Sequence, residues 1–211
     1  MRSAGGRKKR FETVLPEGYV PVYTLDAADK RVGLRLNAAA LAVMALVAAI
    51  GWWGIRPTEL AAHYNLWHSL LLIGGMLLYL VLHELLHGAA YKLLTRRRLT
   101  FGMTATVAFC GVPDIYVYRR TALIALLTPF AVFIPVFLLP ACLCAQAWDR
   151  FGCVVLLAIH LGGCVGDLYD AGLYWFRFRR PDTLMQDTGP KQTFYIKGAE
   201  STTGGTQHVD G

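Results

Sequence analysis

Four apolar runs, each long enough to cross a lipid bilayer, limit the folds open to this chain more than any other feature. They cover residues 36–55, 67–94, 121–145 and 151–176. A transmembrane helix requires about 20 mainly apolar residues. The second run exceeds that length, so it is expected to tilt or to protrude from the bilayer. The sequence therefore predicts an all-α polytopic membrane protein with about four transmembrane helices.

The composition agrees with a membrane protein and argues against a nucleic-acid-binding domain. Of the 211 residues, 55% are hydrophobic and 17% are charged, and the net charge is +7. An average soluble domain has about 25% charged residues. The basic residues flank the apolar runs, whereas a nucleic-acid-binding domain would gather them on one face. We therefore expect contact with a lipid bilayer and none with nucleic acid.

The positions of Lys and Arg predict the orientation in the membrane. Basic residues cluster near the N-terminus and at 95–98, 119–120 and 177–180, whereas the loops at 56–65 and 146–150 hold one arginine each. Cytoplasmic loops of membrane proteins are enriched in Lys and Arg. We therefore expect a multi-pass cell-membrane protein with both termini in the cytoplasm.

The apolar runs divide the chain into three parts. Residues 1–35 are expected to form a cytoplasmic segment, 36–180 a four-span domain, and 181–211 a cytoplasmic tail that is disordered after about residue 197. Residues 99–118, between the second and third runs, are rich in β-branched and aromatic residues. They predict a small membrane-associated β-hairpin around a turn at Gly-Val-Pro-Asp, residues 111–114.

The second apolar run contains the segment His83-Glu84-Leu85-Leu86-His87. On a helix, His83 and His87 lie on one face, where both imidazoles can bind one Zn²⁺. Glu84 is close enough to act as a general base on a metal-bound water. An ionisable side chain within a membrane costs about 2.5–3.5 kcal/mol, which favours a functional role. The alternative is a pair of core histidines hydrogen-bonded to neighbouring helices.

A catalytic zinc site needs a third protein ligand, and the fourth run offers Asp167 and Asp170. Asp167 and the two histidines precede basic clusters by similar numbers of residues, which places them at similar depths in the membrane. Asp167 follows the Gly162/Gly166 pair, a spacing that lets another helix approach closely, and it is preferred to Asp170. His160 is a candidate hydrogen-bond partner of the site or an alternative ligand. Without a metal, Asp167 would form an interhelical hydrogen bond or ion pair.

The cysteines predict neither a disulfide framework nor a cysteine-based zinc site. None of the five forms a CxxC motif, and four lie in apolar runs, where cysteine behaves as a small hydrophobic residue. Cys164, three residues before Asp167, is kept as a further candidate ligand.

These residues resemble the site-2 protease type of intramembrane metallopeptidase, in which HExxH on one transmembrane helix and an aspartate on a later helix bind zinc. Over about residues 12–196 the chain is also similar to a bacterial family of four-span proteins described as putative zincin peptidases. The similarity rests on LPEGY near the start, HELLHG at 83–88, the hairpin region with Pro113, the span with Pro129, and GDLYD at 166–170.

The resemblance implies roles for four residues. His83, His87 and Asp167 would be the zinc ligands, and Glu84 the catalytic base. The setting of the aspartate, Val165-Gly166-Asp167-Leu168, departs from the Leu-Asp-Gly or Asn-Pro-Asp-Gly setting that is common in site-2 proteases.

The expected activity is that of a zinc metalloendopeptidase that cleaves membrane-protein or peptide substrates in the cytoplasmic half of a membrane span. The alternative is a non-catalytic, metal-binding membrane scaffold or chaperone derived from a peptidase. A haem protein is disfavoured because two histidines on one helix cannot both be axial ligands of one haem. A transporter is disfavoured because the chain has no internal repeat of the kind many transporters show. The sequence carries no signal for the oligomeric state.

Overall fold

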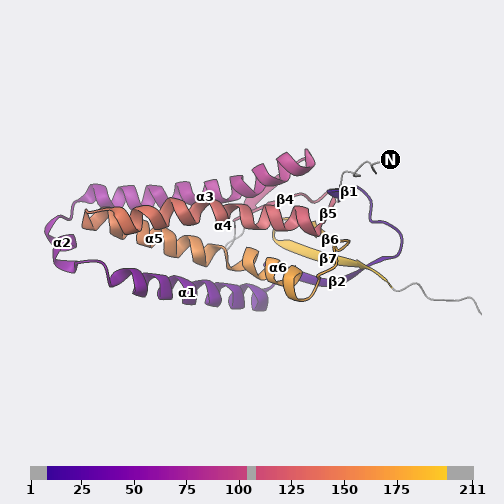
Figure 1. The fold of residues 1–211 in the computed structure, drawn as a ribbon, viewed down its shortest axis with the longest axis horizontal. Helices are drawn as coiled ribbons and strands as arrows, with labels where there is room; N and C mark the ends of the chain where they lie inside the picture. The colour runs from indigo at the N-terminus through magenta and orange to yellow at the C-terminus, as the bar shows by residue number, and fades with distance from the viewer. Residues whose placement is uncertain (1–8, 104–107, 199–211) are drawn as a thin grey trace, which may run out of the picture.

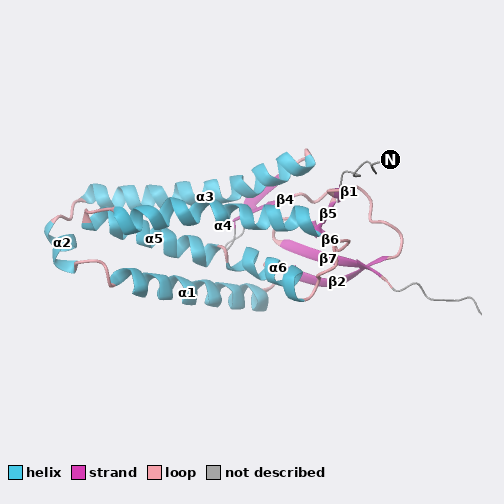
Figure 2. Ribbon diagram, viewed as in Figure 1, coloured by secondary structure: helices cyan, strands magenta, loops and turns pink. Residues whose placement is uncertain are grey.

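The structure is a computed structural model that describes residues 9–103 and 108–198. The helices form an elongated bundle, and the strands gather at one end of it (Figure 1, Figure 2). The helices are α1 (Lys30–Trp52), α2 (Pro57–Ala62), α3 (Leu66–Thr95), α4 (Arg119–Leu143), α5 (Ala147–Gly163) and α6 (Val165–Phe176). The strands are β1 (Phe11–Glu12), β2 (Tyr19–Asp26), β3 (Thr100–Met103), β4 (Ala108–Gly111), β5 (Tyr116–Tyr118), β6 (Leu184–Asp187) and β7 (Lys191–Lys197).

Several helices are suited to a membrane. Among the described residues, α1, α3 and α4 are each long and apolar enough to cross it, and α5 with α6 forms a bent pair that makes a fourth span if counted as one. Many large apolar side chains on α1 and α3 are exposed, including Leu41, Leu46, Leu71 and Leu77. A bilayer would cover such side chains.

The predicted fourth span is broken. Its two helices meet at Cys164 with a bend of 45°. Two glycines, Gly162 and Gly163, end α5, and glycine is a poor helix former because its backbone loses the most entropy on ordering. An added Cβ on Gly162 would collide with Met44 and the Ala40 carbonyl of α1, whereas one on Gly166 would meet nothing. Of the predicted glycine pair, only Gly162 therefore allows a close helix approach.

Three prolines lie within α4, which remains one helix from Arg119 to Leu143. A proline has no N–H to donate to the carbonyl four residues earlier. Pro129 therefore leaves the Ala125 carbonyl without its helical donor. Because α4 lies against α3, a side chain of α3 can bind that carbonyl.

An antiparallel five-stranded sheet, in the order β1-β5-β6-β7-β2, caps one end of the bundle (Figure 2). Its strands come from the N-terminal segment, the middle of the chain and the C-terminal tail. β2 pairs with β7 along its whole length, with Tyr19 opposite Lys197 at one end and Asp26 opposite Lys191 at the other. The prediction of an all-α protein with one small hairpin is therefore wrong for this end of the molecule. Only β6 and β7 are joined by a short turn, and the other pairings of the sheet join segments far apart in the chain.

Residues 99–118 do contain strands, but the predicted turn at residues 111–114 does not join a pair of them into a hairpin. β3 pairs with β4 in a separate two-stranded sheet, with Thr100 opposite Gly111 and Met103 opposite Ala108. The connection between them falls at residues 104–107, outside the described residues. Residues 111–114 lead instead from β4 into β5 of the larger sheet. The turn residues at 111–114 therefore mark a passage between two sheets.

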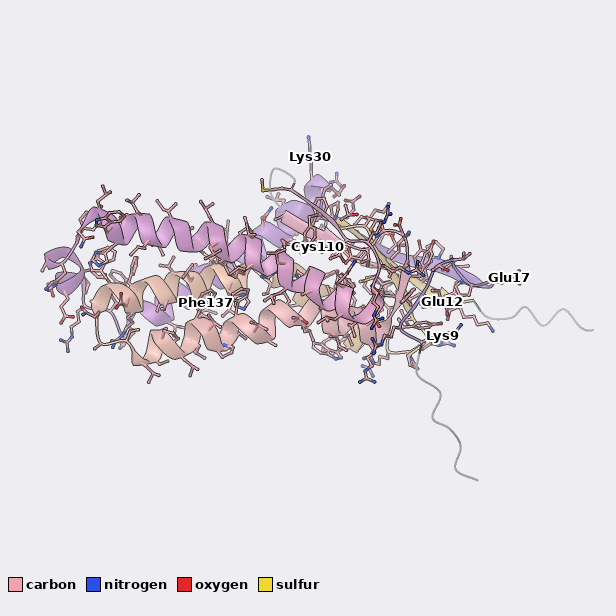
Figure 3. All side chains as sticks on the ribbon, turned by 90° about the horizontal axis from the view of Figure 1, so that it is seen from above. Lys9, Glu12, Glu17, Lys30, Cys110 and Phe137 are labelled. Carbon is pink, nitrogen blue, oxygen red and sulfur yellow. The ribbon has the colours of Figure 1, made fainter. Side chains whose placement is uncertain are left out.

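The main core lies where the helices meet the five-stranded sheet. It includes Tyr91 of α3, Tyr174 of α6 and Phe194 of β7, each 1% exposed or less. A second cluster inside the bundle contains Tyr79, Phe133 and Phe137. Figure 3 labels Phe137 within the helical part and Cys110 nearer the sheet. The candidate site described next lies between these two clusters along α3.

Candidate metal centre

Helix α3 places His83 and His87 one turn apart on a buried face, with 5% and 7% of the residues exposed. Asp167 lies in the first turn of α6, just after the break between α5 and α6. The helix break and the α3 motif thus bring residues 80 positions apart in the chain to one place.

The three donor atoms form a nearly equilateral triangle. His83 Nε2 and His87 Nε2 are 3.2 Å apart, and Asp167 Oδ2 lies 3.4 Å from the first and 3.3 Å from the second. Tetrahedral zinc with bonds of about 2.0–2.1 Å holds its ligand atoms about 3.3 Å apart. Two imidazoles and one carboxylate are also a donor set that zinc prefers. The residues present therefore fit a zinc ion with a fourth position left for water or substrate.

The proline in α4 orients His87. His87 Nδ1 donates a hydrogen bond of 2.9 Å to the Ala125 carbonyl, the group that Pro129 leaves without a helical donor. A neutral imidazole that donates through Nδ1 has its lone pair on Nε2. The ring therefore presents a free electron pair to the other two donor atoms.

Tyr79 holds His83 from the other side. Its hydroxyl lies 3.0 Å from His83 Nδ1 and 3.1 Å from His160 Nδ1. If His83 Nδ1 donates to the hydroxyl oxygen and the hydroxyl donates to His160, every group is satisfied and the lone pair of His83 is on Nε2. The chain of hydrogen bonds therefore supports the metal-binding tautomer of His83, a role such outer partners have in many zinc sites.

Glu84 lies beside the triangle on α3. It is half-buried and makes no hydrogen bond within the described part of the chain. It lines a cavity of about 270 Å³ together with His83, His87 and Asp167. Further walls come from α1, β4 and the β6–β7 turn, with residues Asn37, Ala40, Phe109, Cys110, Gly189 and Gln192. A carboxylate without a fixed partner at the wall of this cavity can accept a proton from a bound water.

The other candidate residues lie close to the triangle but outside it. Asp170 is buried, and its Oδ1 has no hydrogen-bond partner among the described residues. It lines the same cavity but belongs to neither group of potential metal ligands found in the described part of the chain. One of those groups is the triangle itself, and the other consists of His83, His160 and Cys164.

Asp187 of β6 is a cavity residue that the sequence did not point to. It accepts hydrogen bonds from the Tyr91 hydroxyl at 2.7 Å and from the Gly189 N–H at 2.9 Å. Burial raises the pKa of Asp187 to about 6, although these hydrogen bonds act in the opposite direction. The only sequence signal was the turn Asp187-Thr188-Gly189-Pro190, which predicts a turn but not its contact with the cavity.

One comparison with known proteins covers the segment that contains the candidate site. A family model described as putative zincin peptidase matches residues 76–179. The matched segment contains both histidines, Glu84 and Asp167. The searches of curated proteins and of solved structures found no match.

Proposed function

We propose that this protein, whose residues 76–179 belong to the family of putative zincin peptidases, is an intramembrane zinc metalloprotease. The observation that carries the proposal is the triangle of His83, His87 and Asp167 donor atoms beside Glu84. The two histidines and Glu84 lie on α3, which is long and apolar enough to cross a membrane, and Asp167 lies on α6, which meets that criterion only together with α5 as a bent pair. The predicted resemblance to zincin peptidases is confirmed by the family match.

His83, His87 and Asp167 would hold the zinc ion. When bound, zinc polarises the substrate carbonyl and makes water nucleophilic near neutral pH. The chain's own residues then divide the remaining work. Pro129 and Tyr79 keep the two imidazoles oriented, and the buried positions of both rings exclude bulk water. The half-buried Glu84 carboxylate takes the proton of the attacking water and passes it to the leaving amine nitrogen.

The hairpin offers a way to hold an extended substrate. A helical substrate has its backbone groups bonded internally, so it must unwind before a peptide bond can be cleaved. β4 is paired with β3 on one side only, among the described residues, and Phe109 and Cys110 of β4 line the cavity. An unwound segment added to the free edge of β4 would lie next to Glu84 and the metal ligands.

The basic clusters support cleavage near the cytoplasmic side. Arg96, Arg97 and Arg98 follow α3, and Arg119 and Arg120 begin α4. The end of α3 and the start of α4, where these clusters lie, are at the sheet-bearing end of the bundle, away from α2 (Figure 1). Since positive residues favour the cytoplasm, the substrates would be membrane proteins cut in the cytoplasmic half of a span.

The test is cleavage by purified protein in lipid vesicles. Tagged single-span membrane proteins would be reconstituted with wild type, Glu84→Gln, or Glu59→Gln, a matched change at an exposed ion pair with Arg56. We expect cleavage by wild type and Glu59→Gln, and none by Glu84→Gln although it still binds about one zinc per chain. Cleavage by Glu84→Gln at the wild-type rate would refute the mechanism. Metal binding without cleavage of any substrate by the wild type would favour the non-catalytic scaffold.

A further inference from the structure

A second group of metal-binding side chains lies next to the first. It consists of His83, His160 and Cys164, whose donor atoms all lie within 4.8 Å of one another. His160 and Cys164 are fully buried, and His83 is 5% exposed. Neither His160 nor Cys164 takes part in the proposed hydrolysis.

The break between α5 and α6 creates this arrangement. Cys164 ends α5 and precedes α6, and its sulfur turns back toward His160, one helical turn earlier. The Sγ atom lies 3.6 Å from His160 Nδ1. A tetrahedral zinc ion with bonds of about 2.3 Å to sulfur and about 2.1 Å to nitrogen separates these two ligand atoms by about 3.6 Å. The half-site formed by these two side chains therefore has the dimensions of a zinc site.

The Tyr79 hydroxyl and His83 Nδ1 lie next to this half-site. The Tyr79 hydroxyl lies 3.1 Å from His160 Nδ1 and 3.0 Å from His83 Nδ1. His83 thus presents Nε2 to His87 and Asp167, and Nδ1 toward Tyr79 and His160. The two groups use opposite edges of one imidazole ring.

The surroundings favour a soft ion. Phe130, Phe133 and Phe137 surround the His160 ring, with ring centroids 5.6–6.2 Å from its own. Such apolar walls exclude the water that hard cations retain. Thiolate and imidazole are ligands that select zinc and other soft ions. Tyr79 and His83 line the main cavity, which gives an ion a route to this group.

We propose that His83, His160 and Cys164 form a second position for a soft divalent ion such as Zn²⁺, with the Cys164 thiolate as a ligand. Binding there releases the thiol proton. A neutral imidazole has one lone pair, so His83 completes only one of the two groups at a time. An ion in the second position therefore withdraws His83 from the first, which makes this position inhibitory when metal is in excess. The inference concerns metal binding and holds whether or not the protein is a protease.

Cobalt titration of the purified full-length protein tests the proposal, because Co²⁺ replaces zinc and a thiolate ligand adds a charge-transfer band in the near ultraviolet. In wild type, the first Co²⁺ per chain should bind to His83, His87 and Asp167 and produce no such band. We expect the band to appear only with further Co²⁺. In Asp167→Ala, which frees His83 from the first group, the band should appear with the first equivalent. Cys164→Ser should abolish the band in both backgrounds.

Controls make each outcome decisive. Cys153→Ser changes a half-buried cysteine of the same helix and should leave the band intact. The absence of the band in both wild type and Asp167→Ala at every metal ratio would overturn the proposal and leave Cys164 as a packing residue hydrogen-bonded to His160. Persistence of the band in Cys164→Ser would also overturn it. Glu84→Gln should still bind Co²⁺ at both positions although it cannot cleave a substrate. Failure of the proposed proteolysis and failure of the proposed second metal position can therefore be told apart.

Discussion

Pro129 sets the chemistry of a residue on a different helix. It frees the Ala125 carbonyl, and His87 on α3 donates to that carbonyl. Its effect is to fix the imidazole tautomer whose Nε2 can bind metal. A proline that looks from the sequence like a helix-breaking residue is thus part of the candidate metal centre.

Replacing this proline should weaken metal binding without unfolding the protein. Pro129→Ala restores an N–H that competes with His87 for the Ala125 carbonyl, so zinc affinity should fall by about 10-fold or more. Chelator competition measures the affinity. Pro135→Ala, in the same helix, is the matched control and should bind zinc as wild type does. Equal affinities for the two variants would contradict the role given to the proline.

The pKa of Asp187 predicts a pH dependence of stability. Burial raises this pKa from 3.8 to about 6, so between these values the folded protein keeps a proton that the unfolded chain releases. The free energy of unfolding should therefore fall as the pH rises from about 4 to about 6, by up to about 3 kcal/mol, and then level off. Thermal unfolding in detergent measures this effect.

Asp187→Asn should flatten the fall in stability, because the amide does not titrate. Asp182→Asn, at a more exposed ion pair with Arg180, should retain the wild-type slope. An unchanged slope in Asp187→Asn would assign the effect to other carboxylates.

At the residue level, the sequence allowed a prediction where the signal was local. The spacing of His83 and His87 places both on one helix face, and the structure brings Asp167 to them. Tyr79 and Ala125 could not be found in this way. Tyr79 resembles any aromatic residue of an apolar helix, and the role of a backbone carbonyl depends on which helix packs beside it.

At the level of elements, the apolar runs located the helices but not the break in the last span. α1, α3 and α4 overlap the first three predicted spans. Gly162 and Gly166 were interpreted as a packing surface, and of these two only Gly162, near the end of α5, lies against α1. The end of α5 at Gly162 and Gly163, which lets Cys164 turn toward His160, depends on backbone geometry that hydropathy does not encode.

Gly162 and Gly152 form a matched pair of positions in α5. A Cβ on Gly162 would press on Met44 and on the Ala40 carbonyl, whereas one on Gly152 would meet nothing. Gly162→Ala should therefore destabilise the protein by about 1–3 kcal/mol. Gly152→Ala should be neutral or stabilising by up to about 1 kcal/mol, because alanine favours helix. Thermal unfolding in detergent compares them, and equal melting temperatures would contradict the close contact between α1 and α5.

For the whole molecule, the sheet was the part that the sequence did not predict. Strand pairing between distant segments, such as β2 with β7, leaves no local periodicity in the sequence. The sheet also contributes to the site, because Leu25 of β2 and Gln192 of β7 line the cavity. One wall of the candidate centre was therefore missing from the predicted architecture.

The orientation in the membrane remains a prediction that accessible cysteines can test. Thr58 lies in exposed α2, and Lys191 lies at the exposed start of β7 at the opposite end. A membrane-impermeant maleimide should label Thr58→Cys more strongly than wild type in right-side-out vesicles. It should label Lys191→Cys more strongly than wild type only in inverted vesicles. The reverse pattern would place the sheet outside the cytoplasm and contradict the assignment from basic residues.

The pairing of β2 with β7 has a consequence for biosynthesis. β2 leaves the ribosome before any helix of the bundle, and β7, its only sheet partner among the described residues, leaves after all of them. The histidine motif and Asp167 are therefore made and inserted while the wall contributed by the C-terminal strand does not yet exist. A chain still being translated would have the candidate metal ligands without the completed cavity, so the order of synthesis completes the candidate site only after β7 has been made.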